Sequence, residues 1–227
     1  MSVYVYALLG EAPRPSAGAG LSDEPLRVLR VGDLIAAVGD MAEQPAVSEA
    51  TLRAHDVVVR RLAGAVDAIL PVRFGSLLSE SSLTDVLTTR ARELGEALAL
   101  VAGREQMTLR VLGETPVTPR VDPLAGDTAS RDLGPGARYL TARQTEWRRA
   151  RDAPEVAPLR PALQRFVRAE RVTRHDRPPL LASVHHLIDR GDAAAYQAAV
   201  ERATLDAIRL VATGPWPPYA FAPETLG

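Results

Sequence analysis

Histidine is the residue type in this chain with the widest scope for acid–base chemistry, and each of the four histidines has a titratable neighbour in the sequence. The pairs are His55-Asp56, His175-Asp176 and His185-His186. Adjacent residues on a helix or a strand point in different directions, so none of these pairs is a preformed dyad. His55 and His186 also fall on apolar faces of predicted elements, which favours hydrogen-bonded histidines of the protein core.

Two alternative functions follow from polar residues of this kind. A small α+β enzyme could use His55, Glu105 or His185 as general acid or base, provided that the fold brings them into one cleft and shifts their pKa values. A ligand-sensing regulatory domain would instead require a polar pocket at a subunit interface.

Other chemistry is excluded by residue types that the chain lacks. There is no cysteine, and all 27 basic residues are arginine. These absences rule out cysteine nucleophiles, thiolate metal sites, P-loop lysines and Schiff-base lysines. The Gly-x-Ser-x-Gly and His-Glu-x-x-His motifs are absent, as is a Gly-x-Gly-x-x-Gly after a predicted strand. We therefore predict no catalytic, cofactor-binding or metal-binding residues and no small-molecule substrate.

The basic residues are unevenly distributed along the chain. Residues 136–177 contain eleven Arg against five Asp or Glu, whereas the whole chain has a formal net charge of −1. Such asymmetry can mark an acidic partner or nucleic acid, although a solvated, arginine-rich helix is the commoner cause. RNA-recognition domains stack bases on aromatic residues of two central strands, and the strands predicted at 106–112 and 180–188 have none. We therefore predict no nucleic-acid binding.

The hydrophobic pattern of the first half predicts helices and strands in alternation. Residues 3–8 are apolar on both faces, which is typical of a central strand covered on both sides. Two short strands, 26–31 and 34–38, follow around a Gly-Asp turn. Ser48 is expected to cap a helix with one apolar stripe. The stripe comprises Leu52, His55, Val59, Leu62 and Val66.

A buried strand over 68–74 and a second helix complete this half. Gly75 is expected to end the strand, and Gly103 to end the helix. The helix begins after Ser82 and carries an apolar face made of Leu87, Ala91, Leu94, Leu98 and Val101.

The second half restarts the pattern. It predicts strand 106–112, a helix over about 137–151, a weak edge strand at 171–176, strand 180–188, helix 192–203 and strand 205–213. Prolines 154, 158 and 161 break the first helix, which resumes through Leu159, Leu163, Phe166 and Val167. The order βαββαβ is that of the ferredoxin-like unit. We therefore predict an α+β fold of two domains, 1–102 and 103–227, the second a modified ferredoxin-like unit with a long loop at 113–136.

A proline-rich aromatic tail at 214–227 closes the predicted second domain. It contains three of the ten aromatic residues, Trp216, Tyr219 and Phe221, within a span of six positions. Proline fixes the backbone, so these rings are held at low entropic cost. We expect the tail to pack on its own domain, with direct partner binding as the alternative.

The chain is expected to be cytoplasmic. No stretch approaches the roughly 18 uninterrupted apolar residues that a membrane helix needs, and the N-terminal residues lack the basic flank and cleavage site of a signal peptide. We therefore predict no membrane association.

Several segments together resemble the gas vesicle protein F/L family over almost the whole chain. They are Tyr4-Val-Tyr6, His55, Pro71-Val-Arg73-Phe74-Gly75, Gly103-Arg-Glu105, Gly136-Ala-Arg-Tyr139-Leu140 and Gly214-Pro-Trp216-Pro-Pro-Tyr219-Ala-Phe221. The Pro-x-Arg-Phe-Gly segment and the Gly-Pro-Trp-Pro-Pro-Tyr-x-Phe end are specific in combination. The prolines at 154–161 depart from the more continuous helix expected of the family.

The resemblance implies a cytoplasmic protein of two α+β domains that takes part in gas vesicle organisation, as an assembly factor or a minor structural protein. It implies protein–protein interaction with the small hydrophobic shell protein GvpA or with other gas vesicle accessory proteins. No enzymatic activity and no cofactor are associated with the family. F-type and L-type members share these segments.

The segment Arg73-Phe74-Gly75 lies at the end of the strand predicted at 68–74. Gly75 is expected to turn the chain with a dihedral that other residues resist, and Phe74 to fill the core. A buried Arg73 would need a carboxylate such as Glu105 or a run of backbone carbonyls. We predict that this segment is a structural clamp rather than a binding face.

Overall fold

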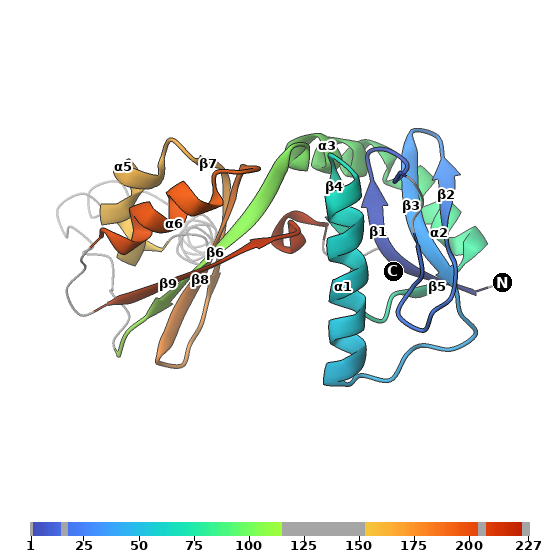
Figure 1. Ribbon diagram of the computed structural model, residues 1–227, viewed down its shortest axis with the longest axis horizontal. Coiled ribbons are helices and arrows are strands. Elements are labelled where there is room, and N and C mark those ends of the chain that lie inside the picture. The colour runs from blue at the N-terminus through green and yellow to red at the C-terminus, as the bar shows by residue number, and fades with distance from the viewer. Residues whose placement is uncertain (1, 15–17, 115–152, 204–207, 224–227) are drawn as a thin grey trace, which may run out of the picture. The chain divides into compact units, whose positions relative to one another are not determined.

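The computed structural model describes residues 2–14, 18–114, 153–203 and 208–223 (Figure 1). The helix expected over 137–151, most of the loop 113–136 and Tyr139 lie outside these residues. The described chain mixes helices and antiparallel strands, as predicted for an α+β fold. No helix within the described ranges is long and apolar enough to cross a membrane.

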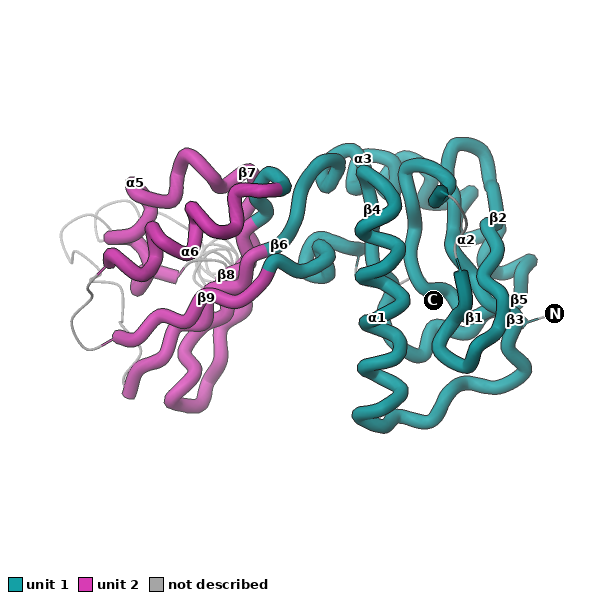
Figure 2. Tube along the Cα trace, in the orientation of Figure 1, with its two compact units in different colours: residues 1–106, 187–190, 215–227 teal, residues 107–186, 191–214 magenta. Residues whose placement is uncertain are grey.

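The chain divides into two compact units (Figure 2). Unit 1 comprises residues 1–106, 187–190 and 215–227, and unit 2 comprises 107–186 and 191–214. The first boundary falls four residues after the predicted one. The tail groups with the N-terminal half and not with the second half, to which the sequence pattern assigns it.

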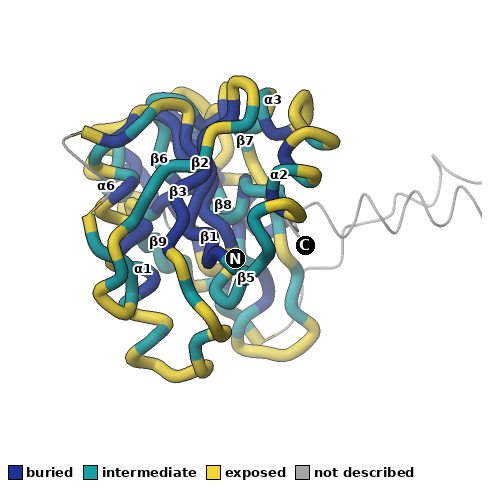
Figure 3. The backbone as a smooth tube through the Cα atoms, turned by 90° about the vertical axis from the view of Figure 1, so that its right-hand side faces the viewer, coloured by how far each residue is buried: buried dark blue, intermediate teal, exposed yellow. Residues whose placement is uncertain are grey.

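Unit 1 is built on a sheet with β1 (Ser2–Leu9) at its centre. The strand order is β2-β3-β1-β4, with β2 at Leu26–Val31, β3 at Leu34–Asp40 and β4 at Ile69–Pro71. A further short strand, β5 (Leu77–Ser79), also pairs with β1. Residues 3–9 are all buried, which confirms the prediction of a central, doubly covered strand (Figure 3).

A β-bulge in β1 changes which of its residues share a face. The register with β3 shifts between Val5 and Ala7, so one extra residue enters β1 there. Tyr4 and Tyr6 therefore share a hydrophobic cluster with Ala7 and Leu9, although simple alternation would place the two pairs on opposite faces.

The helix α1 (Glu49–Ala65) supplies the other side of this cluster. The Ser48 side chain accepts a hydrogen bond from the Thr51 backbone, as a helix cap should. Of the predicted apolar stripe, His55, Val59, Leu62 and Val66 are buried. Leu52 is 44% exposed, so its assignment to the core was wrong: it lies in the first turn of the helix.

The second predicted helix is in fact two helices. These are α2 (Glu80–Thr89), capped by Ser79 rather than following Ser82, and α3 (Ala91–Val101), and the chain departs from helical geometry at Arg90. Their buried residues Leu83, Leu87, Leu94, Leu98 and Val101 include most of the predicted stripe. Gly103 follows α3 with φ +68°, as expected of a glycine that ends a helix.

The second sheet has the order β7-β8-β6-β9. Its strands are β6 (Arg104–Leu112), β7 (Val167–Arg174), β8 (Leu180–Asp189) and β9 (Arg209–Trp216). The predicted edge position of β7 is confirmed, but β7 begins at Val167, so Val167 does not continue a helix. The helical segments are η1 (Pro154–Leu159), α5 (Arg160–Leu163), α6 (Ala193–Glu201) and, in the tail, η2 (Tyr219–Phe221).

Candidate functional site

Several of the residues that carry the family resemblance meet around Tyr4 in unit 1. The Tyr4 and Tyr6 rings lie on one face of β1 with centroids 4.8 Å apart and an edge-to-face angle of 60°. The Phe74 ring lies 6.3 Å from that of Tyr4 and 5.7 Å from that of His55. Four aromatic side chains from three separate segments thus form one cluster, which we call the Tyr4 cluster.

His55 fixes the direction of the hydrogen bonds in this cluster. Its Nε2 lies 3.2 Å from the carbonyl oxygen of Val72, which can only accept, so Nε2 carries the proton. Its Nδ1 is then an acceptor, and the Tyr4 hydroxyl donates to it over 3.0 Å. The backbone N–H of Gly75 donates to the Tyr4 hydroxyl, also over 3.0 Å.

The electrostatics agree with a neutral imidazole. His55 is 4% exposed, and burial lowers its pKa against smaller opposing effects of the Val72 carbonyl and Asp56. The predicted role of a hydrogen-bonded core histidine is therefore confirmed. Because both ring nitrogens are engaged, neither is left to exchange a proton with a substrate.

Tyr6 is hydrogen-bonded to a loop carboxylate that the sequence patterns did not identify. Its hydroxyl donates to Glu24 and accepts from the Leu21 backbone N–H at 2.8 Å. A Cβ built on Gly20 would lie 1.7 Å from the Glu24 carboxylate, and one on Gly39 would lie 2.5 Å from it. These two glycines leave the space that Glu24 occupies. Burial first, and then Glu24, raise the pKa of Tyr6.

The Arg73-Phe74-Gly75 segment divides into two roles. Gly75 has φ +89°, which confirms the expected special turn, and its N–H is bound by Tyr4. Phe74 is half-buried against the cluster. Arg73 is exposed, so it does not require the carboxylate or backbone-carbonyl partners that a buried arginine would need at this position. The strand β4 ends at Pro71, and Arg73 therefore lies beyond the sheet.

An arginine that binds backbone carbonyls does exist in unit 1, at Arg190. Its guanidinium donates to the Val66 oxygen at 2.9 Å and to the Asp67 oxygen at 3.1 Å, just after the end of α1. Glu105, the carboxylate suggested for Arg73, is half-buried in β6. Nothing in the sequence near Arg190 marks it as the partner of residues more than 120 positions away.

The aromatic tail also belongs to unit 1. Phe221 is 1% exposed, and Tyr219 packs against the hydrophobic cluster that contains Tyr4 and Tyr6. The Tyr219 hydroxyl donates to Asp56 at 3.3 Å, and the Arg60 guanidinium lies 4.4 Å from the Trp216 ring centroid. The tail thus packs inward, although on the N-terminal half and not on the predicted second domain.

Unit 2 contains a second buried histidine. His186 is 3% exposed and lies between the Tyr196 hydroxyl, 2.7 Å from Nδ1, and the Glu170 carboxylate, 2.9 Å from Nε2. This confirms its predicted core role. The hydrogen bond from His186 lowers the pKa of Glu170, whereas burial raises the pKa of Tyr196.

The residues of the enzymatic alternative are divided between the two units. His55 and Glu105 belong to unit 1 and His185 to unit 2, where its Nδ1 lies 3.1 Å from the Thr108 hydroxyl. The described residues also include no group of three His, Asp or Glu that could hold a metal ion.

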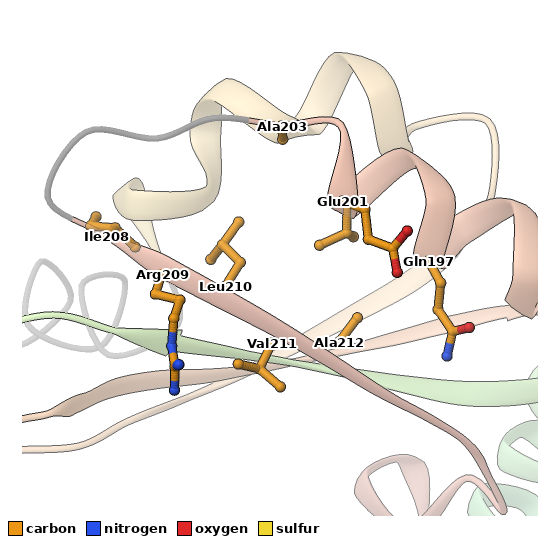
Figure 4. A pocket seen from close by; sticks show the side chains of 9 residues that line it. Gln197, Glu201, Ala203, Ile208, Arg209, Leu210, Val211 and Ala212 are labelled. Atoms are coloured by element: carbon orange, nitrogen blue, oxygen red, sulfur yellow. The ribbon is translucent and has the colours of Figure 1, made fainter.

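A cavity of about 570 Å³ lies between α6 and β9 in unit 2 (Figure 4). Its lining residues are largely aliphatic, namely Val200, Ile208, Leu210, Val211 and Ala212, and also include Gln197, Glu201 and Arg209, of which Arg209 directs its side chain away from α6 (Figure 4). None of the residues predicted from the sequence lines it.

Comparison with known proteins gives the context for this geometry. The family model described as "Gas vesicle synthesis protein GvpL/GvpF" matches residues 2–223. Gas vesicle protein F of Streptomyces sp. (strain CB03234) is 28% identical and aligns with 97% of this chain and 99% of its own length. Gas vesicle protein L of the same strain is also 28% identical, over 96% of this chain and 92% of its own length.

Solved structures show the same fold. The crystal structure of GvpF from Microcystis aeruginosa aligns with a TM-score of 0.71 at 16% identity, over 98% of this chain and 99% of that one. GvpF from Anabaena sp. PCC7120 aligns with a TM-score of 0.71 at 15% identity, over 99% and 97% of the two chains. With a family model that matches nearly every residue from the first strand to the aromatic tail, the chain belongs to the GvpL/GvpF family of gas vesicle synthesis proteins.

Proposed function

We propose that this protein is an accessory or minor structural component of gas vesicle formation that binds the hydrophobic shell protein GvpA, other gas vesicle accessory proteins, or both. It acts in the cytoplasm and at the gas vesicle, by binding and not by catalysis. Family membership over residues 2–223 supports a role in gas vesicle assembly.

The proposal rests on how three of the family-motif residues are hydrogen-bonded. The polar atoms of Tyr4, His55 and Gly75 are hydrogen-bonded to one another or to backbone groups inside unit 1. Side chains that build a closed interior leave the outer surface to act on other molecules. This arrangement favours a binding protein over an enzyme, because the reactive groups of an enzyme must reach a substrate.

We also infer that unit 2 is a modified ferredoxin-like domain. The strand order β7-β8-β6-β9, with α6 connecting β8 and β9, supports this inference. In chain order the strands read 2-3-1-4, which is the antiparallel arrangement of a βαββαβ unit. The first helix of that unit would fall within residues that the structure does not describe.

Co-purification tests the proposed function directly. The tagged full-length chain, expressed in a vesicle-forming cell, should capture GvpA or another gas vesicle protein. Removing the gene should leave cells viable but poor in vesicles. Normal vesicle number and shape in such cells, together with failure to capture any gas vesicle protein, would overturn the proposal.

Arg73 provides a sharper version of this test. It is exposed beside the half-buried Phe74, so Arg73→Ala should leave the melting temperature unchanged while reducing capture of GvpA. The matched control is Arg92→Ala on α3, where the side chain is 93% exposed. Equal capture by both variants would remove Arg73 from the binding surface.

Ligand sensing is a second candidate because of the cavity between α6 and β9. Its mixed aliphatic and charged lining suits a small amphipathic molecule. A thermal-shift screen of the full chain against a metabolite panel should give a stabilising hit if this role is real, and an empty screen counts against it.

A further inference from the structure

One face of the second sheet can be traced from the position of His186. The His186 side chain points toward α6, where it meets Tyr196. Successive residues of a strand point to opposite faces, so His185 points away from α6, and Ser183 shares its side. We call this side of the sheet, within unit 2, the basic face.

Two side-chain contacts extend the basic face across the neighbouring strands. His185 Nδ1 lies 3.1 Å from the Thr108 hydroxyl of β6, and Ser183 Oγ lies 3.0 Å from His175 Nε2, just beyond β7. Alternation then places Arg110 of β6 on this face. It also adds Thr173 and Arg171 of β7.

The edge strand β9 contributes the third arginine. In Figure 4, Arg209 and Val211 point away from α6, whereas Leu210 points toward it. Alternation adds Thr213, whose hydroxyl donates to the Thr108 backbone oxygen at 3.3 Å. The basic face therefore runs across all four strands.

The charge of this face is of one sign. Arg110, Arg171 and Arg209 are all exposed. Among the described strand residues of unit 2, no Asp or Glu alternates onto the basic face. Two acidic residues close to it in sequence have other partners. Glu170 binds His186 on the α6 side. Asp189 lies at the end of β8 that belongs to unit 1, where it is 3.7 Å from Arg104.

We propose that the basic face binds an acidic segment of another protein. Arginine presents a planar fork that can bind a carboxylate through two hydrogen bonds, and the exposed hydroxyl of Thr173 adds a neutral donor beside it. A surface of one sign also attracts an oppositely charged partner before contact and so accelerates binding.

An acidic protein segment fits this face better than a nucleic acid does. Single-stranded nucleic acids are held by bases stacked on aromatic rings. The strand residues assigned to the basic face within unit 2 include no Phe, Tyr or Trp. The inference goes beyond the proposed function because it names a surface and a ligand chemistry that do not depend on GvpA.

Binding of a labelled hexaglutamate peptide to the full chain tests this inference. Fluorescence anisotropy at low salt should show saturable binding, and added NaCl should weaken it because exposed charges are screened. Arg110→Glu and Arg209→Glu should each weaken binding by about tenfold or more, since attraction becomes repulsion. The control Arg92→Glu makes the same charge change on α3, outside the face, and should bind as the unaltered chain does.

The outcomes separate this inference from the proposed function. Hexaglutamate binding that is absent, or equal in all three variants while circular dichroism shows them folded, overturns the inference. Binding of an oligothymidylate in preference to hexaglutamate would also overturn it and assign the face to nucleic acid. Failure to capture any gas vesicle protein would bear on the proposed function alone, because the peptide measurement needs no gas vesicle protein.

Discussion

The Tyr4 hydroxyl is the central polar atom of the Tyr4 cluster, because it accepts from Gly75 and donates to His55. Tyr4→Phe removes both bonds and leaves a backbone N–H and a ring nitrogen without partners. We expect the free energy of unfolding to fall by about 1–3 kcal/mol. Urea denaturation measures the loss. The control is Tyr219→Phe, which breaks one 3.3 Å bond to a half-buried Asp56 and should cost less. Equal losses would show that the chain of hydrogen bonds is not important for stability.

His55 should make the stability depend on pH below neutrality. Burial lowers its folded-state pKa below the unfolded value of about 6.5, so the unfolded chain binds a proton first as the pH falls. Its contribution is therefore fully present above pH 6.5 and is lost as the pH falls toward the folded-state pKa. The pKa of His185 is lowered as well, so the chain must be compared with His55→Gln.

As the pH falls by about two units from 7.5, the unaltered chain should lose stability more steeply than His55→Gln, by up to about 1.4 kcal/mol per pH unit. Urea midpoints at half-unit pH intervals would measure the two slopes. Parallel slopes would mean that His55 titrates alike in the folded and unfolded chains.

Residue roles were predictable where a local pattern decides them. The buried His55 follows from its place on the apolar stripe of α1, and the turn at Gly75 from a glycine that ends an apolar run. The Tyr4–His55–Gly75 hydrogen bonds depend on how three distant segments align, which no local pattern encodes. Arg73 was misplaced because the apolar run continues past Pro71, where the strand ends.

At the scale of the elements, the segment that follows α1 depends on an arginine located just after β8. Arg190 donates to the carbonyl oxygens of Val66 and Asp67, the two residues that follow α1. Arg190→Ala should lower the free energy of unfolding by about 1–3 kcal/mol, because charged hydrogen bonds are lost. Thermal unfolding followed by circular dichroism would measure this.

Two variants make the Arg190 prediction specific. Arg190→Lys keeps the charge but not the planar fork, so it should restore only part of the stability. Arg92→Ala removes an exposed i,i+4 pair with Glu96 and should change stability by less than about 0.5 kcal/mol. If Arg190→Ala is as mild as Arg92→Ala, the carbonyl contacts contribute nothing.

Elements were easier to predict the longer they are and the clearer their local hydrophobic pattern is. The strands β1, β2 and β3 and the cap of α1 match their sequence signals. The break between α2 and α3 was not predicted because the apolar spacing from Leu87 to Val101 continues through Arg90. The strand β5 escaped notice because it has only three residues, all of them half-buried.

At the scale of the whole molecule, the tail completes the core of unit 1. Phe221 is 1% exposed, and the Ala220 N–H donates to the Gln106 side chain at 2.8 Å. Phe221→Ala should cost about 3–5 kcal/mol, as expected for a large aromatic removed from a core. Hydrogen exchange should show the loss of protection in β1 and β4, more than 140 residues away in sequence. Val57→Ala, at a side chain 60% exposed on α1, should leave protection unchanged. Loss of protection confined to the tail would show that Phe221 packs without supporting the core.

The mixed α+β character was predictable because the sequence carries both helical and strand patterns of hydrophobic residues. The return of the tail to unit 1 was not, since it depends on a contact between segments separated by most of the chain.

This return has a consequence for how the protein is made. A ribosome releases residues 215–223 after every other described part of unit 1, so the first half emerges with a place in its core still empty. Closing that core requires a contact across about 150 residues, and such non-local contacts slow folding. During synthesis the N-terminal half therefore exposes apolar surface for longer than unit 2, and a chaperone that acts on the nascent chain would find its binding sites there.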